Sequence, residues 1–326
     1  MRSCARQSSK APRRCRRRVP RPAWPMSEIV RIAKAVASNQ LARLAPAVYV
    51  RLTGQTGRGS EAESAADIAA YAHRCYDEYF DKLGIARPAI EGFLDGKSLL
   101  EYGPGDLPAV AALMIAGGAP QVRCIDRFPL VRLSPKNVEA MQALRPGLSL
   151  QARQRLDGVF ADPRHPEAGL RAGCIDYLVR PGGTSGLRHE IDLVFSRAVL
   201  EHVDDLEASL ADMVAAMKPG ALAIHLVDLR SHGLHRGNRL DFLAWSRPTW
   251  QLMYSAKGFP NRWRVDRYRE LLARLPVDVL RLEPTERASP AEVAQVRPML
   301  AEPFRALDDE DLAWLGFWLV FRRRAD

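Results

Sequence analysis

The sequence predicts an α/β fold: a mostly parallel seven-stranded sheet with helices on both faces, an N-terminal helical extension and an antiparallel last strand. Two observations support this prediction. Short apolar segments alternate with helical segments after Gly96, which is the pattern of βαβ units, and a glycine turn follows the first apolar segment. The chain has 326 residues, of which 47% are hydrophobic, so it can bury a substantial core.

Residues 26–90 are expected to form a helical lid or flank. A helix is predicted near 27–44, where apolar residues recur with helical spacing, and Pro46 is expected to end it. Ser60 and Glu63 are spaced as a capping box, which predicts the start of a second helix.

Residues 91–326 are expected to form the α/β domain, with an insertion on the substrate side near 231–263. Strands are predicted near 98–102, 121–126, 174–179, 191–196, 221–228, 277–283 and 314–322. A further helix is predicted near 206–217 by apolar residues at helical spacing, and another is predicted near 265–275.

The positive charge of the chain is confined to its first residues. The formal net charge is +10, but residues 1–25 hold nine of the 48 basic residues and no acidic residue, which leaves 39 basic and 38 acidic residues in 26–326. A near-neutral domain gains little by releasing counterions from a polyanion, so nucleic acid is disfavoured as a partner. We expect residues 1–25 to be a disordered basic tail or an untranslated segment before Met26; an RNA-binding arm is the alternative.

The cysteines and the hydropathy bear on location. Five cysteines, at positions 4, 15, 75, 124 and 174, show no CxxC or Cys/His ligand spacing. This pattern favours free thiols in a reducing compartment and no metal ion. The longest mostly apolar run, near 107–119, is too short to span a bilayer. We therefore expect a cytoplasmic protein without a membrane span, of undetermined oligomeric state.

The segment 99–106, LLEYGPGD, predicts a strand that runs into a glycine turn. Gly103 and Gly105 let a ligand approach the backbone, and Glu101 at the strand end suits an ammonium or hydroxyl group. Asp126 ends the next strand, where an acid can accept both hydroxyls of a ribose. The two carboxylates suit a nucleoside with a cationic amino-acid tail. A glycine turn with only a structural role is the alternative.

Four motifs in order resemble the small-molecule branch of the class I S-adenosylmethionine-dependent methyltransferases, from about Gly96 to the C-terminus. They are LEYGPG at 100–105, VRCIDRF at 122–128, IDLVFSRAVLEHV at 191–203 and MKPGA at 217–221. The resemblance implies a Rossmann-like fold, S-adenosyl-L-methionine as cofactor and methyl transfer as the activity. A nicotinamide-dependent oxidoreductase is the rival enzyme, but Pro108 stands where its fingerprint needs a third glycine.

The resemblance also implies which residues bind the cofactor. These are Glu101, Gly103, Gly105, Asp126, Arg127, Phe128, Ser196 and Arg197. Phe128 is expected to cover the adenine. The family often has an acid after the third strand to hold the adenine amino group, whereas residues 177–187 read YLVRPGGTSGL, so backbone groups at 184–186 are the candidates for that contact.

The catalytic residues are predicted in the loop after the fifth strand. Asp228 and His232 are expected near the transferred methyl group, where His232 accepts a proton from a hydroxyl and Asp228 orients its ring. Hydrogen bonds that only hold the loop are the alternative role. His202 is expected near the cofactor at the start of a helix, in a structural role, and His225 is expected in the core.

The acceptor is expected to be a small molecule or a glycan-like group, methylated on oxygen. Aromatic residues and arginines are interleaved between 239 and 263, and flat aromatic faces suit a sugar or another planar, polar substrate. Alternatively, this cluster packs the N-terminal helices onto the sheet. Residues 196–199 read SRAV instead of the Asp/Asn-Pro-Pro-aromatic motif of enzymes that methylate base amino groups. A cofactor-binding protein without catalysis is the alternative function.

Overall fold

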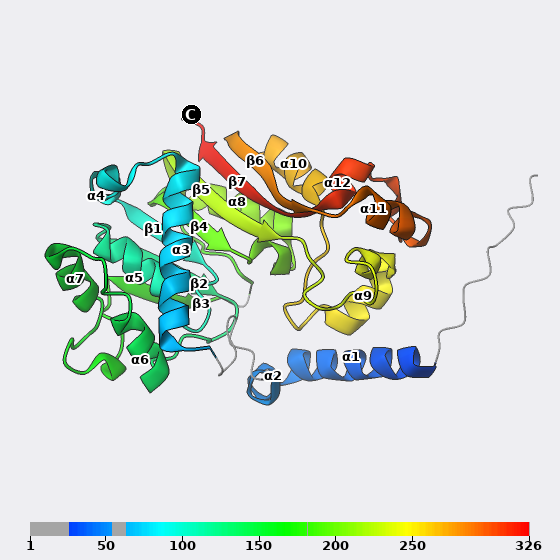
Figure 1. Cartoon of the computed structure of the whole chain (residues 1–326), viewed down its shortest axis with the longest axis horizontal. Coiled ribbons are helices and arrows are strands. Elements are labelled where there is room, and N and C mark those ends of the chain that lie inside the picture. The colour runs from blue at the N-terminus through cyan, green and yellow to red at the C-terminus, as the bar shows by residue number, and fades with distance from the viewer. Residues whose placement is uncertain (1–25, 54–62, 181, 326) are drawn as a thin grey trace, which may run out of the picture.

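The computed structural model describes residues 26–53, 63–180 and 182–325, so the predicted tail at 1–25 lies outside the described residues. Its strands are β1 (Ser98–Tyr102), β2 (Gln121–Asp126), β3 (Ile175–Val179), β4 (Ile191–Arg197), β5 (Met217–Asp228), β6 (Val277–Arg287) and β7 (Trp314–Arg323). They form one sheet in the order β3-β2-β1-β4-β5-β7-β6 (Figure 1). Only β7 runs antiparallel to its neighbours, β5 and β6. The predicted fold class is confirmed.

Twelve α-helices occur within the described residues. They are α1 (Met26–Leu44), α2 (Pro46–Thr53), α3 (Ala65–Leu83), α4 (Ile90–Leu94), α5 (Ala109–Ala116), α6 (Pro135–Gln142), α7 (Leu150–Asp157), α8 (Leu206–Ala216), α9 (Arg247–Tyr254), α10 (Val265–Ala273), α11 (Pro290–Val296) and α12 (Asp309–Ala313). Within that part of the chain, every helix is too short or too polar to span a bilayer.

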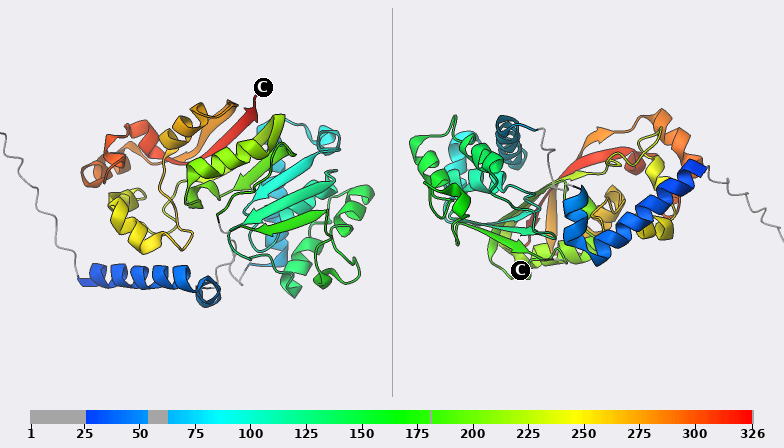
Figure 2. Two further views of the ribbon diagram at one scale, coloured as in Figure 1. Left: turned by 180° about the vertical axis from the view of Figure 1, so that it is seen from behind. Right: turned by 90° about the horizontal axis from the view of Figure 1, so that it is seen from below.

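The sheet is buried on both faces by two separate core clusters. Successive side chains of a strand point to opposite faces, so Leu99 joins the cluster under α3, α4, α5, α6 and α7, while Leu100 joins the cluster under α8 and α10. Helix α3 lies in front of the sheet in Figure 1, and α8 lies in front when the molecule is seen from behind in Figure 2. This two-sided burial explains why β1 and β4 read as nearly continuous apolar runs.

A third core cluster lies beside the sheet and joins the insertion to the C-terminal helices. Phe242, Trp245 and Trp250 pack there with Val293 and Phe304. Helix α1 packs along α9, and three of its apolar residues border the same cluster, namely Ile32, Ala35 and Val36. The aromatic residues of the insertion therefore anchor an N-terminal helix, which is the packing role that the sequence left as the alternative.

The first helix, α1, ends at Leu44 as predicted, and Pro46 begins α2, because proline is well suited to the first turn of a helix, where its missing N–H is not needed. The second predicted helix begins later than the spacing of Ser60 and Glu63 suggested. Helix α3 begins at Ala65, with Ser64 as the N-cap that accepts a hydrogen bond from Asp67 N. The predicted start at Ser60 lies outside the described residues.

Arg264 ties the loop after β5 to the start of β7. The side chain is 1% exposed and donates hydrogen bonds to the carbonyl oxygens of Leu229 at 2.8 Å, Leu312 at 3.1 Å and Trp314. Burial lowers the pKa of Arg264 to about 10, so the guanidinium stays charged at neutral pH. Charge-assisted hydrogen bonds offset the cost of burying it and fix the loop that carries His232.

Replacing Arg264 with methionine should lower the free energy of unfolding by about 3 kcal/mol, because buried carbonyl groups then lose their donor at about 1–3 kcal/mol each. Urea unfolding followed by circular dichroism measures the change. Arg274→Met is the matched control, since Arg274 pairs with Glu270 at the surface and its loss should change stability little. Equal effects of the two substitutions would contradict the structural role of Arg264.

Candidate functional site

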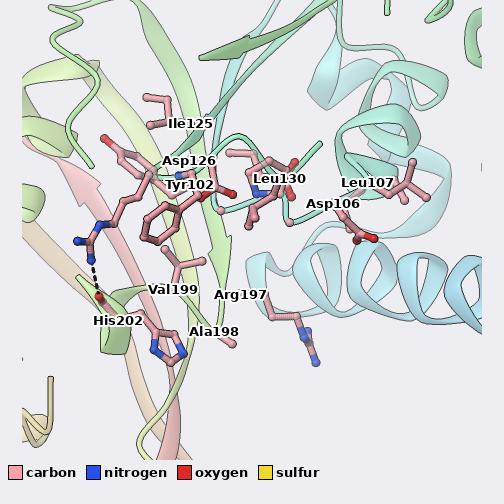
Figure 3. A pocket seen from close by; sticks show the side chains of 18 of the residues that line it. Tyr102, Asp106, Leu107, Ile125, Asp126, Leu130, Arg197, Ala198, Val199 and His202 are labelled. Carbon is pink, nitrogen blue, oxygen red and sulfur yellow. Dashed lines mark hydrogen bonds between the residues drawn. The ribbon is translucent and has the colours of Figure 1, made fainter. Parts of the chain in front are cut away.

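A cavity of about 540 Å³ lies at the carboxyl ends of β1, β2 and β4. This volume is within the range of about 300–1,000 Å³ that is usual for small-molecule sites. All but one of the predicted cofactor-binding residues line it: Glu101, Gly103, Gly105, Asp126, Arg127, Phe128 and Arg197. The wall is completed by α3, by the turn after β4 and by residues 257–258 of the insertion (Figure 3).

The glycine turn after β1 has backbone angles that only glycine adopts easily. Gly103 and Gly105 have φ values of 67° and 75°. A Cβ atom on Gly103 would lie 2.4 Å from a methyl carbon of Val199 in the turn after β4. Gly103 is therefore required for the close approach of two turns, in addition to opening the backbone toward a ligand.

Glu101 at the end of β1 is a buried carboxyl group without a protein cation among the described residues. The side chain is 7% exposed, and Oε2 accepts a hydrogen bond from Cys124 Sγ at 3.6 Å. Burial raises the pKa of Glu101 to about 8; the Cys124 hydrogen bond opposes this rise, and the nearby Asp126 adds to it. Such a carboxyl favours a ligand that brings its own positive charge.

Asp126 ends β2 on the same side of the cavity. Its Oδ1 accepts a hydrogen bond from Phe128 N at 3.4 Å. Burial raises the pKa of Asp126 to about 6, although the backbone N–H groups of Phe128, Arg127 and Gly105 lower it. The carboxylate is thus ionised at neutral pH and can accept hydroxyl protons from a ligand.

The two arginines of the cavity are held by acidic residues. Arg127 forms two hydrogen bonds with Asp204, at 2.7 and 3.2 Å, and lies at 3.4 Å from the carbonyl oxygen of His202. Arg197 pairs with Glu78 of α3 at 2.7 Å. The Arg197 guanidinium also lies over the rings of Tyr71 and Trp318, which places it beside α3 (Figure 3).

Two predicted contacts are not available at the cavity. Ser196 is 1% exposed and forms a hydrogen bond with Nδ1 of the buried His225 at 2.7 Å, so its side chain belongs to the core of the sheet. The backbone N–H groups of Ser185 and Gly186, expected near adenine, both donate to the Asp212 carboxylate. From the loop after β3, Gly183 is the residue that lines the cavity.

The turn after β4, η3 (Leu200–His202), brings a histidine to the cavity wall. Burial and the neighbouring His232 lower the pKa of His202 to about 4, so its imidazole is neutral. The rings of His202 and His232 are in edge-to-face contact, with centroids 4.8 Å apart. The sequence predicted only a structural role for His202, because the LEHV motif gives no sign of where the ring points.

The predicted Asp228–His232 pair lies behind His202 and outside the cavity lining. Nε2 of His232 is 4.0 Å from Oδ2 of Asp228, beyond hydrogen-bond distance. Arg230 instead donates hydrogen bonds to both carboxylate oxygens of Asp228. Burial raises the pKa of Asp228, but these hydrogen bonds lower it more, so the pKa lies below its usual value. Asp228 is therefore engaged with Arg230 in this structure.

Comparison with known proteins places the chain in a family. Residues 71–275 match the sequence model of a family described as "Methyltransferase domain". Among curated proteins, no match was found. Solved structures with a similar fold include an S-adenosylmethionine-dependent methyltransferase from Mesorhizobium loti. The two sequences are 18% identical, the alignment covers 72% of this chain and 96% of that chain, and the TM-score is 0.41.

Two other similar structures carry more specific names. Phosphoethanolamine N-methyltransferase 2 from Haemonchus contortus, in complex with S-adenosyl-L-methionine, is 14% identical over 73% of this chain and 52% of that chain, with a TM-score of 0.38. The [4+2]-cyclase SpnF is 12% identical over 90% of this chain and 97% of that chain, with a TM-score of 0.44. Because the family match covers more than half of the chain, the protein belongs to the methyltransferase-domain family and is an S-adenosylmethionine-dependent methyltransferase.

Proposed function

We propose that this methyltransferase transfers a methyl group to a hydroxyl group of a small molecule. The observation that carries the proposal is that His202, which lines the cavity beyond the residues assigned to the cofactor, contacts His232 outside the cavity lining. A hydroxyl group must lose its proton when it is methylated, and imidazole groups serve this chemistry near neutral pH.

The cofactor half of the cavity is assigned to residues that fit its chemistry. Glu101 receives the ammonium group, Asp126 the ribose hydroxyls, and Phe128 one face of the adenine. Arg197, beside α3, suits the carboxylate of the amino-acid tail. The buried Glu101, with a thiol as its hydrogen-bond partner, supports the fit because a cationic ligand would offset its burial.

The acceptor half is assigned to α3, His202 and the insertion. Ile68 and Cys75 of α3 line the cavity, as does Lys257 of the insertion, whose Nζ donates to Ser38 of α1 at 2.7 Å. These contacts support the division into an N-terminal helical flank and a substrate-side insertion. The glycan-like acceptor loses support because Phe242, Trp245 and Trp250 are buried in the third core cluster rather than facing the cavity.

The bound cofactor supplies an electrophilic methyl group on a sulfonium centre. Methylation of the acceptor oxygen would form a carbon–oxygen bond as the carbon–sulfur bond breaks, and the electron pair of the broken bond would remain on sulfur. The hydroxyl proton leaves on the side of His202 and His232. The contribution of the protein is then to align the oxygen and to activate its hydroxyl group.

Cofactor binding at pH 7 should release close to one proton from the protein. Free Glu101, with a pKa of about 8, is mostly protonated at pH 7, and an adjacent ammonium group favours the ionised carboxylate. Calorimetry in buffers of different ionisation enthalpy counts the protons. Glu101→Gln should abolish the release and weaken binding by at least about tenfold. Glu91→Gln, at an exposed position on α4, is the control; a release that survives Glu101→Gln would contradict the assignment.

The contribution of Asp126 to cofactor affinity should vanish at low pH. A carboxylate accepts two ribose hydroxyls only when ionised, so its contribution is complete well above pH 6 and is lost as the pH falls through about 6. At pH 8, Asp126→Asn should raise the Kd by at least about tenfold. The ratio of variant to wild-type Kd, which cancels contributions common to both proteins, should decline toward one at pH 5. A ratio that does not change with pH would remove Asp126 from this role.

The acceptor atom is tested with pairs of small molecules that differ only by a hydroxyl or an amino group at one position. S-Adenosylhomocysteine should form with hydroxyl acceptors; formation only with amines, thiols or carbon acceptors would overturn the proposal.

His202→Ala and His232→Ala should each lower turnover by about 10² to 10⁴ with nearly unchanged cofactor affinity. The control is His165→Ala, at an exposed position away from the cavity.

A further inference from the structure

Three metal-ligating side chains converge next to the cavity. Donor atoms of Glu201, His202 and His232 all lie within 4.8 Å of one another. The first two come from η3 after β4, and His232 comes from the loop after β5, so neighbouring parallel strands deliver them to the same edge of the sheet. Neither the spacing of the cysteines nor that of the histidines indicates such a cluster in the sequence.

Glu201 is a buried carboxyl group that forms no ion pair with a lysine or arginine among the described residues. Its side chain is 1% exposed, and neither carboxylate oxygen has a hydrogen bond of normal geometry, although the backbone N–H groups of Glu201 and Asp228 lie close enough to oppose the rise in its pKa on burial. Nδ1 of His202 is also buried without a hydrogen bond, and its Nε2 is 3.9 Å from Glu201 Oε1. Burying a carboxylate without a compensating charge costs several kcal/mol. A cation between the three side chains would satisfy the carboxylate and the imidazole together.

The backbone of the cluster is held in place from several sides. Asn261 of the insertion donates through Nδ2 to the carbonyl oxygens of Leu200 at 2.9 Å and Val203 at 3.1 Å, and through its backbone N to Glu201 O at 2.6 Å. His232 has a φ of 50°, which non-glycine residues rarely adopt. These constraints position the side chains before any ion binds, as a metal site requires.

We propose that Glu201, His202 and His232 bind one divalent transition-metal ion. Two imidazoles and one carboxylate suit Fe²⁺, Mn²⁺, Co²⁺ or Zn²⁺ better than Mg²⁺ or Ca²⁺, which prefer oxygen ligands. With bonds of about 2.1 Å, an ion spans donors about 4 Å apart, so small side-chain rotations complete the site.

His202 also lines the cavity, so an ion bound to this side chain would lie next to the acceptor half. The role of the ion rests on the proposed function. The ion would bind the acceptor hydroxyl and lower the pKa of that hydroxyl, so that the proton leaves to solvent before the oxygen attacks the methyl group. In this arrangement His232 is a metal ligand, and the hydroxyl is activated by the ion.

Cobalt binding to the full-length chain tests the site directly. After chelator treatment, Co²⁺ titration followed by visible absorption and calorimetry should show one ion per chain. His202→Ala and His232→Ala should each weaken binding by about 100-fold or more. His235→Ala, a histidine in the same loop that pairs with Ser231, should leave it unchanged. Glu201→Gln, which keeps the shape of the side chain, is the second ligand variant should either alanine variant fail to fold.

The outcomes separate the metal site from the proposed function. Absence of saturable Co²⁺ binding, or binding that His202→Ala and His232→Ala leave unchanged, overturns the metal site. If the chelated protein methylates a hydroxyl acceptor at full rate, the catalytic role of the ion is also overturned while the proposed function stands. If Co²⁺ binds through these residues and only amines are methylated, the metal site stands and the proposed function falls.

Discussion

The position of β1 between β2 and β4 is the constraint on which the cavity depends. The chain builds outward from β1 to β3 and then crosses back to place β4 on the other side of β1. At such a switch in strand order the connections leave in opposite directions, and a crevice opens at the carboxyl ends of the strands. The glycine turn, Asp126 and the turn after β4 meet in this crevice because each directly follows one of these strands.

Closing the crevice requires segments that are distant in the sequence. Arg127 at the end of β2 contacts the turn after β4 through Asp204 and the His202 carbonyl, and Asn261 of the insertion holds the same turn from the other side. Arg264, three residues later, fixes the loop after β5. The insertion thus locates both halves of the histidine pair, and the third core cluster gives it a rigid base.

The strands, and the convergence of most predicted cofactor-binding residues on one cavity, were predictable because their signals are local. All seven strands lie within a few residues of the predicted positions, and the segment 99–106 encodes strand, turn and carboxylate in one continuous motif. Ser196 could not be placed because alternation along β4 decides which face it occupies, and that face is the core. The sequence also could not show whether the aromatic residues of the insertion pack in a core or face a ligand, because a buried cluster and a binding face use the same residue types.

The acceptor half depended on tertiary contacts that no motif encodes. Asp228 and His232 are four residues apart, which suggested a pair, but Arg230 between them takes the carboxylate. The contact of His232 with His202 requires the positive φ of His232 and the proximity of two turns that are about thirty residues apart. Sequence spacing gives no access to either condition, so His202 was assigned only a structural role.

The charged groups around the cavity and in the loop after β5 follow one pattern. Three arginines are each paired with an acidic residue: Arg127 with Asp204, Arg197 with Glu78 and Arg230 with Asp228. Glu101 and Glu201 are buried, and neither forms an ion pair with a lysine or arginine in the described part of the chain.

Burying a carboxyl group without a cationic partner favours its neutral form and equally favours a ligand that brings a positive charge. Glu101 lies beside the glycine turn and lines the cavity, whereas Glu201 lies next to His202 and outside the cavity lining. The same electrostatic demand therefore underlies both proposals, a cationic cofactor group at Glu101 and a metal ion at Glu201.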